Sequence, residues 1–315
     1  MTTQSQAGWR AAIEQAAGRI ASHVRHTPVM ALEPHLLPFA ANVTLKLESL
    51  QHSGSFKARG AFNNLLSMDV PAAGVIAASG GNHGAAVAYA AKTLGHTAEI
   101  FVPTIAAPQK LARLEQYGAT TFQTGDNYAE TLAACEARQA ETGAVGVHAY
   151  DSAATIAGQG TIAREFEQQV EALDTLLVAV GGGGLIGGIA AWFESSARVI
   201  SVETHGTATL ERALEAGKPV PVEVSGLAAD ALGARLIGTY GFDIAKVHVQ
   251  QSVLVGDDDV RAAQQFLWRE LRLVAEPAGA TALAALLCGA YAPAANERIG
   301  IIICGANTDP GSVAG

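Results

Sequence analysis

The chain has 315 residues, of which 49% are hydrophobic and 16% are charged, and its formal net charge is -9. This composition is typical of a compact globular protein and excludes a largely disordered chain. No run of lysine or arginine occurs, so nucleic-acid binding is not expected. The start of the chain lacks the regions of a signal peptide, and the three cysteines form neither a disulfide framework nor a zinc pattern. We therefore expect a cytoplasmic protein.

The first predicted helix of chemical interest follows SGSFKARG, residues 53–60. Apolar residues recur at helical spacing after Lys57, and Ser53 or Ser55 would cap this helix. Lys57 then lies in the first turn, where the positive partial charge of the backbone N–H groups disfavours a protonated amine. A neutral lysine amine is a nucleophile that can form a Schiff base. The plain alternative is an exposed lysine that tolerates a small electrostatic penalty.

Short apolar runs alternate with helical patterns from residue 74 onwards. The first series predicts strand 74–79, helix 83–95, strand 98–103, helix 108–119, a short strand at 119–123 and a helix near 127–142. The second series predicts helix 158–170, strand 175–180, helix 185–195, strand 198–203, two helical stretches separated at Pro277 and strand 298–304. Strands that are apolar throughout and separated by helices indicate parallel sheets covered on both faces. We expect two α/β domains, with residues 217–256 as the least regular part.

Residues 176–193 carry no charge over a length near the lower bound for a membrane-spanning helix. Four consecutive glycines in this window would cost such a helix several kcal/mol, at about 1 kcal/mol each. The window therefore predicts a buried strand, a glycine loop and a buried helix, and no membrane segment.

Two glycine-containing loops join predicted strands to predicted helices. In ASGGNHG, residues 78–84, backbone N–H groups could turn inward at a helix N-terminus and bind an anion such as a carboxylate. An ordinary turn, capped by Asn82 and His83, fits the same pattern. In VGGGGLIGG, residues 180–188, four bare glycines before a helix are typical of a phosphate cradle, with close packing of helix on strand as the alternative.

A dinucleotide-binding site is a competing interpretation of the second loop. Gly182, Gly184 and Gly187 satisfy the pattern G-x-G-x-x-G, and Glu203 ends the next strand about 20 residues on, where an acid that binds a ribose belongs. An NAD-dependent enzyme is therefore possible from this loop alone. It would leave Lys57 unexplained.

The last predicted strand leads into CGANTDPG and brings Cys304 to its carboxyl end, where ligand sites of α/β proteins lie. A thiol there is a weak and neutral hydrogen-bond partner. The alternative is a buried structural cysteine.

Pyridoxal phosphate is one ligand that would use all four features. It needs a lysine for its aldehyde, a cradle for its phosphate, a donor near its ring oxygen and a partner for its ring nitrogen. The motifs SGSFKARG, SGGNHG, GGGGL, AGQGTIA (157–163), AEPAGA (275–280) and CGAN occur in one order over nearly the whole chain. As a set they resemble the serine/threonine dehydratase family of fold type II pyridoxal-phosphate enzymes.

The resemblance implies specific roles. Lys57 would form the Schiff base and later move the Cα proton, Asn82 would meet the ring hydroxyl, and Cys304 would face the ring nitrogen. The implied cofactor contacts are Phe56, Lys57, Asn82, Gly181, Gly182, Gly183, Gly184, Leu185 and Cys304. The implied substrate contacts are Ser79, Gly80, Asn82, His83, Tyr150 and Asp151.

The reaction that the resemblance implies is β-elimination from L-threonine or L-serine, which yields a 2-oxo acid and ammonia. Alternative substrates are threo-phenylserine and threo-hydroxyaspartate, although no arginine is evident for a second carboxylate. Racemisation and β-replacement are alternative reactions. Racemases of the family carry a serine where this chain has Gly80, and glycine cannot transfer a proton.

The resemblance also bears on metal binding and domain organisation. Some members hold a divalent ion through a carboxylate pair, and Glu203 matches the first of these, but Thr209 stands at the second position. We therefore expect no metal. A small domain, residues 70–148, would be inserted in a large cofactor-binding domain, residues 1–69 and 149–315, as in tryptophan synthase β. A homodimer is expected because family members are commonly dimers.

Overall fold

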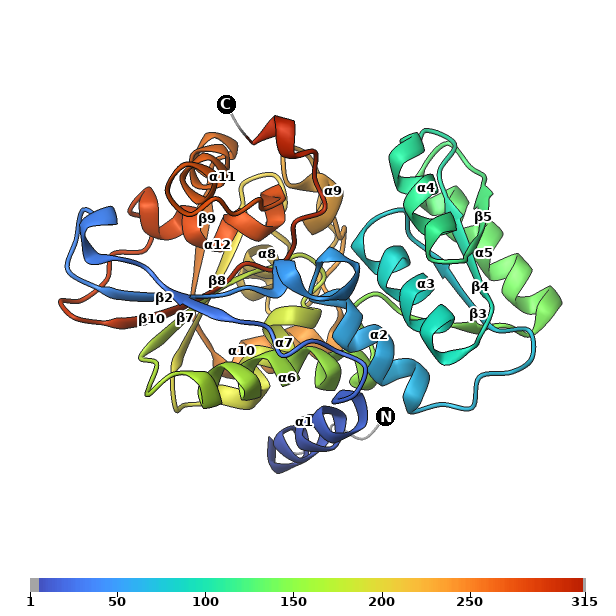
Figure 1. Ribbon diagram of the computed structural model, residues 1–315, viewed down its shortest axis with the longest axis horizontal. Helices are drawn as coiled ribbons and strands as arrows, with labels where there is room; N and C mark the ends of the chain where they lie inside the picture. The colour runs from blue at the N-terminus through green and yellow to red at the C-terminus, as the bar shows by residue number, and fades with distance from the viewer. Residues whose placement is uncertain (1–5, 314–315) are drawn as a thin grey trace.

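The strands form two sheets in the computed structural model, which describes residues 6–313 (Figure 1). The six-stranded sheet has the order β1-β2-β10-β7-β8-β9 and the four-stranded sheet the order β5-β4-β3-β6. The first contains β1 (Val29–Ala31), β2 (Asn42–Lys46), β7 (Thr175–Ala179), β8 (Arg198–Thr204), β9 (Val249–Val255) and β10 (Arg298–Ile302). The second contains β3 (Val75–Ala78), β4 (Ala98–Val102), β5 (Thr120–Gln123) and β6 (Val145–Gly146). All neighbouring strands are parallel except β1 and β2.

Helices cover both sheets. They are α1 (Gln6–Ile20), α2 (Lys57–Leu66), α3 (Asn82–Leu94), α4 (Pro108–Gln116), α5 (Tyr128–Thr142), α6 (Ala153–Gln169), α7 (Gly184–Phe193), α8 (Thr209–Ala216), α9 (Ala229–Leu232), α10 (Thr239–His248), α11 (Asp257–Leu271) and α12 (Pro277–Leu287). In Figure 1, α11 and α12 lie over one face of the six-stranded sheet and α6, α7 and α10 over the other. The predicted architecture of mostly parallel sheets covered by helices is confirmed.

The two sheets define two lobes. We call the six-stranded sheet with its helices the large lobe, and the four-stranded sheet with α3, α4 and α5 the small lobe. Helix α2 lies between them, packed on α6 of the large lobe and on α3 of the small lobe. The strands of the small lobe fall between residues 75 and 146, inside the segment 70–148 assigned from the sequence to a small domain. The division into folding domains stays a prediction.

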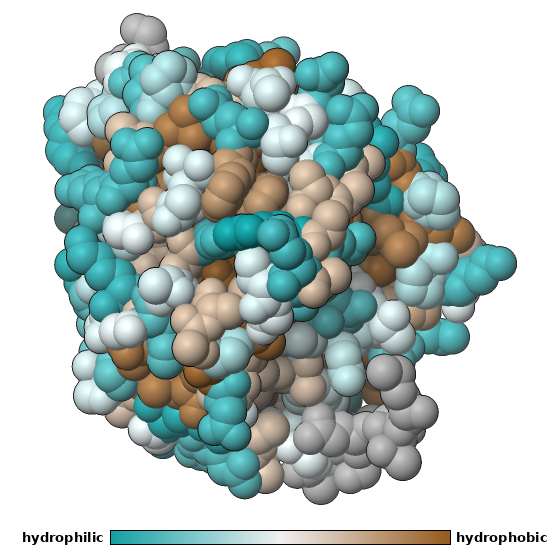
Figure 2. Space-filling view, turned by 90° about the vertical axis from the view of Figure 1, so that its right-hand side faces the viewer, coloured by the Kyte–Doolittle hydropathy of each residue, from teal (hydrophilic) through white to brown (hydrophobic). Residues whose placement is uncertain are grey.

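The face of the small lobe has a mixed surface. Figure 2 shows hydrophilic side chains along much of its outline, with hydrophobic ones set between them. Across residues 6–313, no helix combines the length and the hydropathy that a membrane crossing requires. The uncharged window at 176–193 folds as β7, a glycine loop and α7, as the sequence predicts.

The prediction of residues 217–256 as the least regular part is wrong in its second half. Helix α10 and strand β9 lie there, and β9 pairs with β8 at the edge of the sheet. Because an edge strand keeps several side chains half-exposed, its sequence VQQSVLV lacks the continuous apolar run of a central strand.

Three neighbouring parallel strands bring the chemical features to one edge of the large lobe. Strands β2 and β7 flank β10, and each pairs with it in parallel. Their carboxyl ends therefore lie together. The chain continues from β2 towards Lys57, from β10 into Cys304 and from β7 into the glycine loop. Topology thus places in one region three segments that are far apart in the sequence.

A buried ion cluster, formed by Lys46, Glu48, Arg59 and Glu165, fastens α2 to the large lobe. The Arg59 guanidinium donates to both oxygens of Glu48, at 2.8 and 2.7 Å, and to Glu165 Oε2 at 3.0 Å. Lys46 Nζ donates to Glu165 Oε1 at 2.5 Å. Since Arg59 is 1% exposed and follows Lys57 by two residues, its ionic contacts hold the start of α2 against α6 and against Glu48, which follows β2.

Replacement of Arg59 by methionine should destabilise the fold strongly. Arg59→Met leaves two buried carboxylates without their main partner, which costs about 3–5 kcal/mol of unfolding free energy. Urea unfolding of the purified protein measures this loss. Arg164→Met is the matched control, because Arg164 pairs with Glu14 at a partly exposed site and its removal should cost less than about 1 kcal/mol. Equal losses for the two variants would show that the cluster does not anchor α2.

Candidate active site

A pocket of about 460 Å³, including its open mouth, lies at the carboxyl ends of β2, β10 and β7. It gathers all nine residues that the sequence predicts to contact a cofactor: Phe56, Lys57, Asn82, Gly181, Gly182, Gly183, Gly184, Leu185 and Cys304. Tyr150, a predicted substrate contact, also lines it. The sequence analysis gave no role to seven further lining residues: Ala179, Val180, Ile186, Ala231, Leu232, Glu276 and Ala278.

Lys57 is the first residue of α2, as the sequence predicts. Its Nζ donates to the backbone oxygen of Ala149 at 2.8 Å and lies 5.2 Å from the centre of the Phe56 ring. Burial lowers the pKa of Lys57 to about 8, and the nearby Cys304 and Glu276 offset only part of this effect. More of this amine is therefore neutral, and nucleophilic, near pH 7 than in an exposed lysine.

The predicted serine cap of α2 is wrong. Phe56 occupies the N-cap position, and no side chain caps this helix end. The Ser55 hydroxyl is buried without a hydrogen-bond partner, because Ser55 adopts an extended conformation and bridges to Gly305. This bridge ties the segment before Lys57 to the segment after Cys304.

The glycine loop has the geometry of an anion cradle. It joins β7 to α7, whose N-cap Gly183 has a left-handed backbone with φ of 89°. A Cβ at Gly182 would lie 2.3 Å from the Tyr150 ring, so only glycine fits beneath this aromatic side chain. The first N–H groups of α7 have no partner within the helix and face the end where an anion would sit.

The Glu203 carboxylate is hydrogen-bonded to the start of α8. Its carboxylate accepts hydrogen bonds from the backbone of Leu210 and Glu211, at 2.8 Å each, and from Thr209 Oγ1 at 3.1 Å. Burial raises the pKa of Glu203 to about 7. These bonds stabilise the N-terminus of α8 and use both carboxylate oxygens, which the NAD interpretation would assign to a ribose.

Cys304 is 2% exposed, and its Sγ donates to the backbone oxygen of Ala278 at 3.4 Å. Burial raises the pKa of Cys304 well above its usual range, with Glu276 adding to this effect. The thiol is therefore neutral. Such a thiol suits a ring nitrogen as a neutral partner.

The substrate contacts that the sequence predicts form two groups, one around the start of α3 and one, Tyr150 and Asp151, before α6. Ser79 and Gly80 form the turn before α3, and the Ser79 hydroxyl accepts from the Gly81 N–H at 3.3 Å. His83 points away from this turn, with Nε2 2.7 Å from the backbone oxygen of Val147. Burial, followed by the nearby Lys57, lowers the pKa of His83 to about 3, so its ring is neutral and donates to that oxygen.

Asp151 also has a structural contact where the sequence predicts a substrate contact. Its Oδ1 accepts from the backbone N–H of Tyr240 at 3.0 Å, at the start of α10. The neighbouring Tyr150 donates to the backbone oxygen of Leu236 at 3.2 Å while its ring covers the glycine loop. The two residues thus join the segment after the small lobe to the loop before α10.

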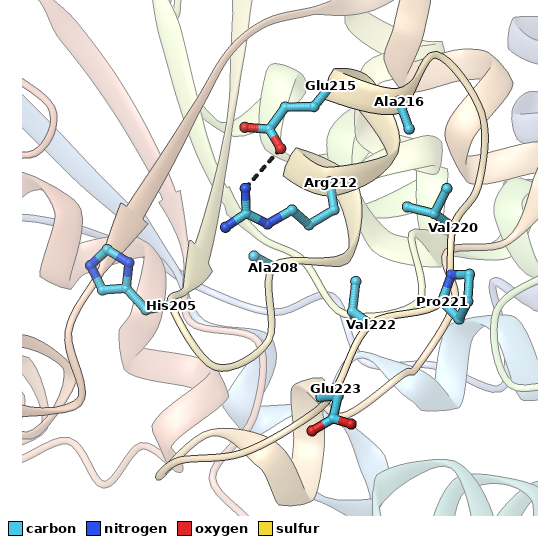
Figure 3. A pocket seen from close by; sticks show the side chains of 9 residues that line it. All are labelled: His205, Ala208, Arg212, Glu215, Ala216, Val220, Pro221, Val222 and Glu223. Carbon is cyan, nitrogen blue, oxygen red and sulfur yellow. Dashed lines mark hydrogen bonds and ion pairs between the residues drawn. The ribbon is translucent and has the colours of Figure 1, made fainter.

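A second hollow, shown in Figure 3, lies beside α8 and is lined by His205, Ala208, Arg212, Glu215, Ala216, Val220, Pro221, Val222 and Glu223. Arg212 pairs with Glu215 at 2.7 Å within this hollow. Its described lining contains neither a lysine nor a glycine loop. The pocket at Lys57 is therefore the better candidate for chemistry.

The site defines a class of protein. A partly neutral lysine, a glycine cradle at a helix N-terminus and a neutral thiol surround one pocket. These groups match the aldehyde, the phosphate and the ring nitrogen of pyridoxal phosphate. The residues present therefore fit this cofactor.

Comparisons with known proteins lead to the same cofactor. A family model described as "Pyridoxal-phosphate dependent enzyme" matches residues 20–305. Phenylserine dehydratase of Ralstonia pickettii is 40% identical over 94% of this chain and 92% of its own length. L-threonine ammonia-lyase of Geobacter sulfurreducens is 37% identical over 87% and 70%. The structure of maize serine racemase superposes with a TM-score of 0.91 at 33% identity, covering 96% of this chain and 95% of that one.

The chain belongs to the pyridoxal-phosphate-dependent enzymes, in the serine/threonine dehydratase family with fold type II. The predictions of family, fold and cofactor are confirmed. Among the lining residues that had no predicted role, Glu276 is the one with a polar side chain, and its motif AEPAGA contributed to the resemblance.

The capture of the cofactor aldehyde by the apoprotein should speed up through a pH near 8. Because the pKa of Lys57 is lowered to about 8, its neutral and nucleophilic fraction grows as the pH rises through that value. Stopped-flow absorbance with added pyridoxal phosphate measures the rate, and Lys57→Ala gives the background from other lysines. A midpoint at the ordinary lysine value of 10.5 would contradict the burial argument.

Proposed function

We propose that this protein is a pyridoxal-phosphate-dependent lyase that converts β-hydroxy α-amino acids to 2-oxo acids and ammonia. The observation that carries this proposal is the buried Lys57 amine, with its pKa lowered to about 8, facing a pocket that holds a glycine cradle. The dehydratase and ammonia-lyase named among the relatives support the same reaction type.

The residues of this chain would divide the work as follows. Bound pyridoxal phosphate supplies an aldehyde for the substrate amine and a ring that accepts electrons from Cα. Lys57, in its neutral form, takes the Cα proton on Nζ. The turn at Ser79 and Gly80, before the N-terminus of α3, binds the substrate carboxylate. Cys304 keeps the environment of the ring nitrogen uncharged.

Gly80 favours elimination over racemisation. A racemase needs a second group that returns a proton to the opposite face of Cα, and glycine has no side chain. The position is also confined, since a Cβ there would lie 3.3 Å from Val102 Cγ1. The serine racemases among the relatives therefore share the fold and cofactor, while this chain lacks the group at this position that racemisation needs.

We propose that the preferred substrate is threo-phenylserine, with L-threonine and L-serine as smaller substrates. Tyr150 supports this preference because its aromatic ring lines the pocket over the glycine loop. Among the described lining residues there is no arginine for a second carboxylate, so threo-hydroxyaspartate should be a poor substrate.

The location and assembly of the protein are also proposals. The three cysteines are unpaired, which fits a reducing cytoplasm. We propose a homodimer because members of this family are commonly dimers. Size-exclusion chromatography with light scattering would distinguish a dimer from a monomer.

Release of 2-oxo acid and ammonia from a substrate panel tests the function. The holoenzyme should act on threo-phenylserine with a higher kcat/KM than on L-threonine or L-serine, and Lys57→Ala should be inactive on all of them. Silence on the whole panel with cofactor bound would defeat the dehydratase proposal, and β-replacement assays with a thiol would follow.

Tyr150→Leu tests the aromatic preference. Its ratio of kcat/KM for phenylserine over threonine should fall roughly three- to tenfold, because the stacking contact is lost for only one substrate. Tyr240→Leu is the matched control, since the ring of Tyr240 packs against Trp9 outside the pocket. An unchanged ratio in Tyr150→Leu would contradict the role of this ring while leaving the reaction type standing.

A further inference from the structure

The Asn82 carboxamide is held from two sides by the large lobe. Its Nδ2 donates to Glu276 Oε1 at 2.5 Å, and its Oδ1 accepts from Asn307 Nδ2 at 2.6 Å. Asn82 is the first residue of α3 in the small lobe, so both hydrogen bonds cross from one lobe to the other. We call these three side chains the amide clamp.

A backbone carbonyl fixes the orientation of the clamp. Asn307 Nδ2 also donates to the backbone oxygen of Ser53 at 2.8 Å. Because a carbonyl oxygen only accepts, the amino group of Asn307 and not its oxygen must face Ser53. The same amino group meets Asn82, which therefore turns its oxygen to Asn307 and its own amino group to Glu276.

This orientation leaves one donor of Asn82 for the pocket. The Nδ2 group carries two hydrogens, and Glu276 accepts one of them. No residue within 6–313 accepts the other, and Asn82 lines the pocket between Phe56, Lys57 and Glu276. A ligand oxygen in the pocket can therefore bond the remaining N–H.

The surroundings of Glu276 are built to keep its carboxyl group in this place. Glu276 is 4% exposed, and a Cβ at Gly305 would lie only 2.1 Å from its Oε1. A glycine at 305 thus leaves the space that Glu276 occupies. The backbone N–H of Glu276 donates to the oxygen of Gly305 at 3.1 Å, which ties the two segments together.

We propose that Glu276 and Asn307 are positioning residues, which clamp the Asn82 carboxamide across the two lobes and direct its remaining N–H to the ring oxygen of the cofactor. The clamp concerns the cofactor that the family shares. It does not depend on which amino acid is the substrate.

The test compares the cofactor complexes of Glu276→Ala, Glu276→Gln and Asn307→Ala with that of the parent protein. The dissociation constant of pyridoxal phosphate comes from absorbance titration. The pH dependence of the ratio between the visible and near-ultraviolet bands reports the protonation of the ring oxygen. Glu297→Ala is the matched control, because Glu297 is a buried carboxylate that bonds Tyr291 and Arg198 outside the pocket.

Glu276→Ala and Asn307→Ala should each weaken cofactor binding roughly tenfold and shift the pH dependence of the band ratio. Glu276→Gln should remain within about threefold of the parent, since its amide oxygen still accepts from Asn82. Glu297→Ala should lower thermal stability without a spectral shift. If Glu276→Ala does not fold, the half-buried Asn307→Ala decides alone. Binding within about twofold of the parent, together with an unchanged band ratio, would overturn the proposal.

Discussion

A guanidinium group buried between two carboxylates fixes the start of α2, and the reactive lysine depends on this anchor. Arg59 is held by Glu48 and Glu165, so the helix cannot rotate without breaking charged hydrogen bonds in a region that excludes water. Lys57 stands two residues earlier and is presented to the pocket in a fixed direction. Ionic contacts thus position the lysine, while burial keeps part of it neutral.

Chemistry at the pocket arises from the convergence of strand ends. The parallel order of β2, β10 and β7 places a nucleophile, a neutral thiol and an anion cradle at one edge of a sheet. The small lobe adds the turn before α3 from the other side, and the amide clamp connects the two lobes at Asn82. None of these groups identifies the ligand by itself. Together they match the functional groups of one cofactor.

Several parts of this site could be predicted from the sequence because they are local patterns. Lys57 after small residues, the four glycines before α7 and Cys304 after a buried strand each follow from a short stretch. The role of Glu276 could not, because its partner Asn82 lies 194 residues away in the chain. The contact of Asp151 with Tyr240 likewise exists only in the folded chain, so the sequence could not reveal it. Strand β9 was missed because an edge strand has no continuous apolar run.

Identification of the lysine that carries the cofactor tests the central claim most directly. The holoenzyme would be reduced with borohydride, digested and analysed by tandem mass spectrometry. Our account predicts a pyridoxyl phosphate adduct on Lys57, in the peptide that contains SGSFKARG. An adduct confined to another lysine, such as the partly exposed Lys110 on α4, would contradict the assignment of this pocket as the active site.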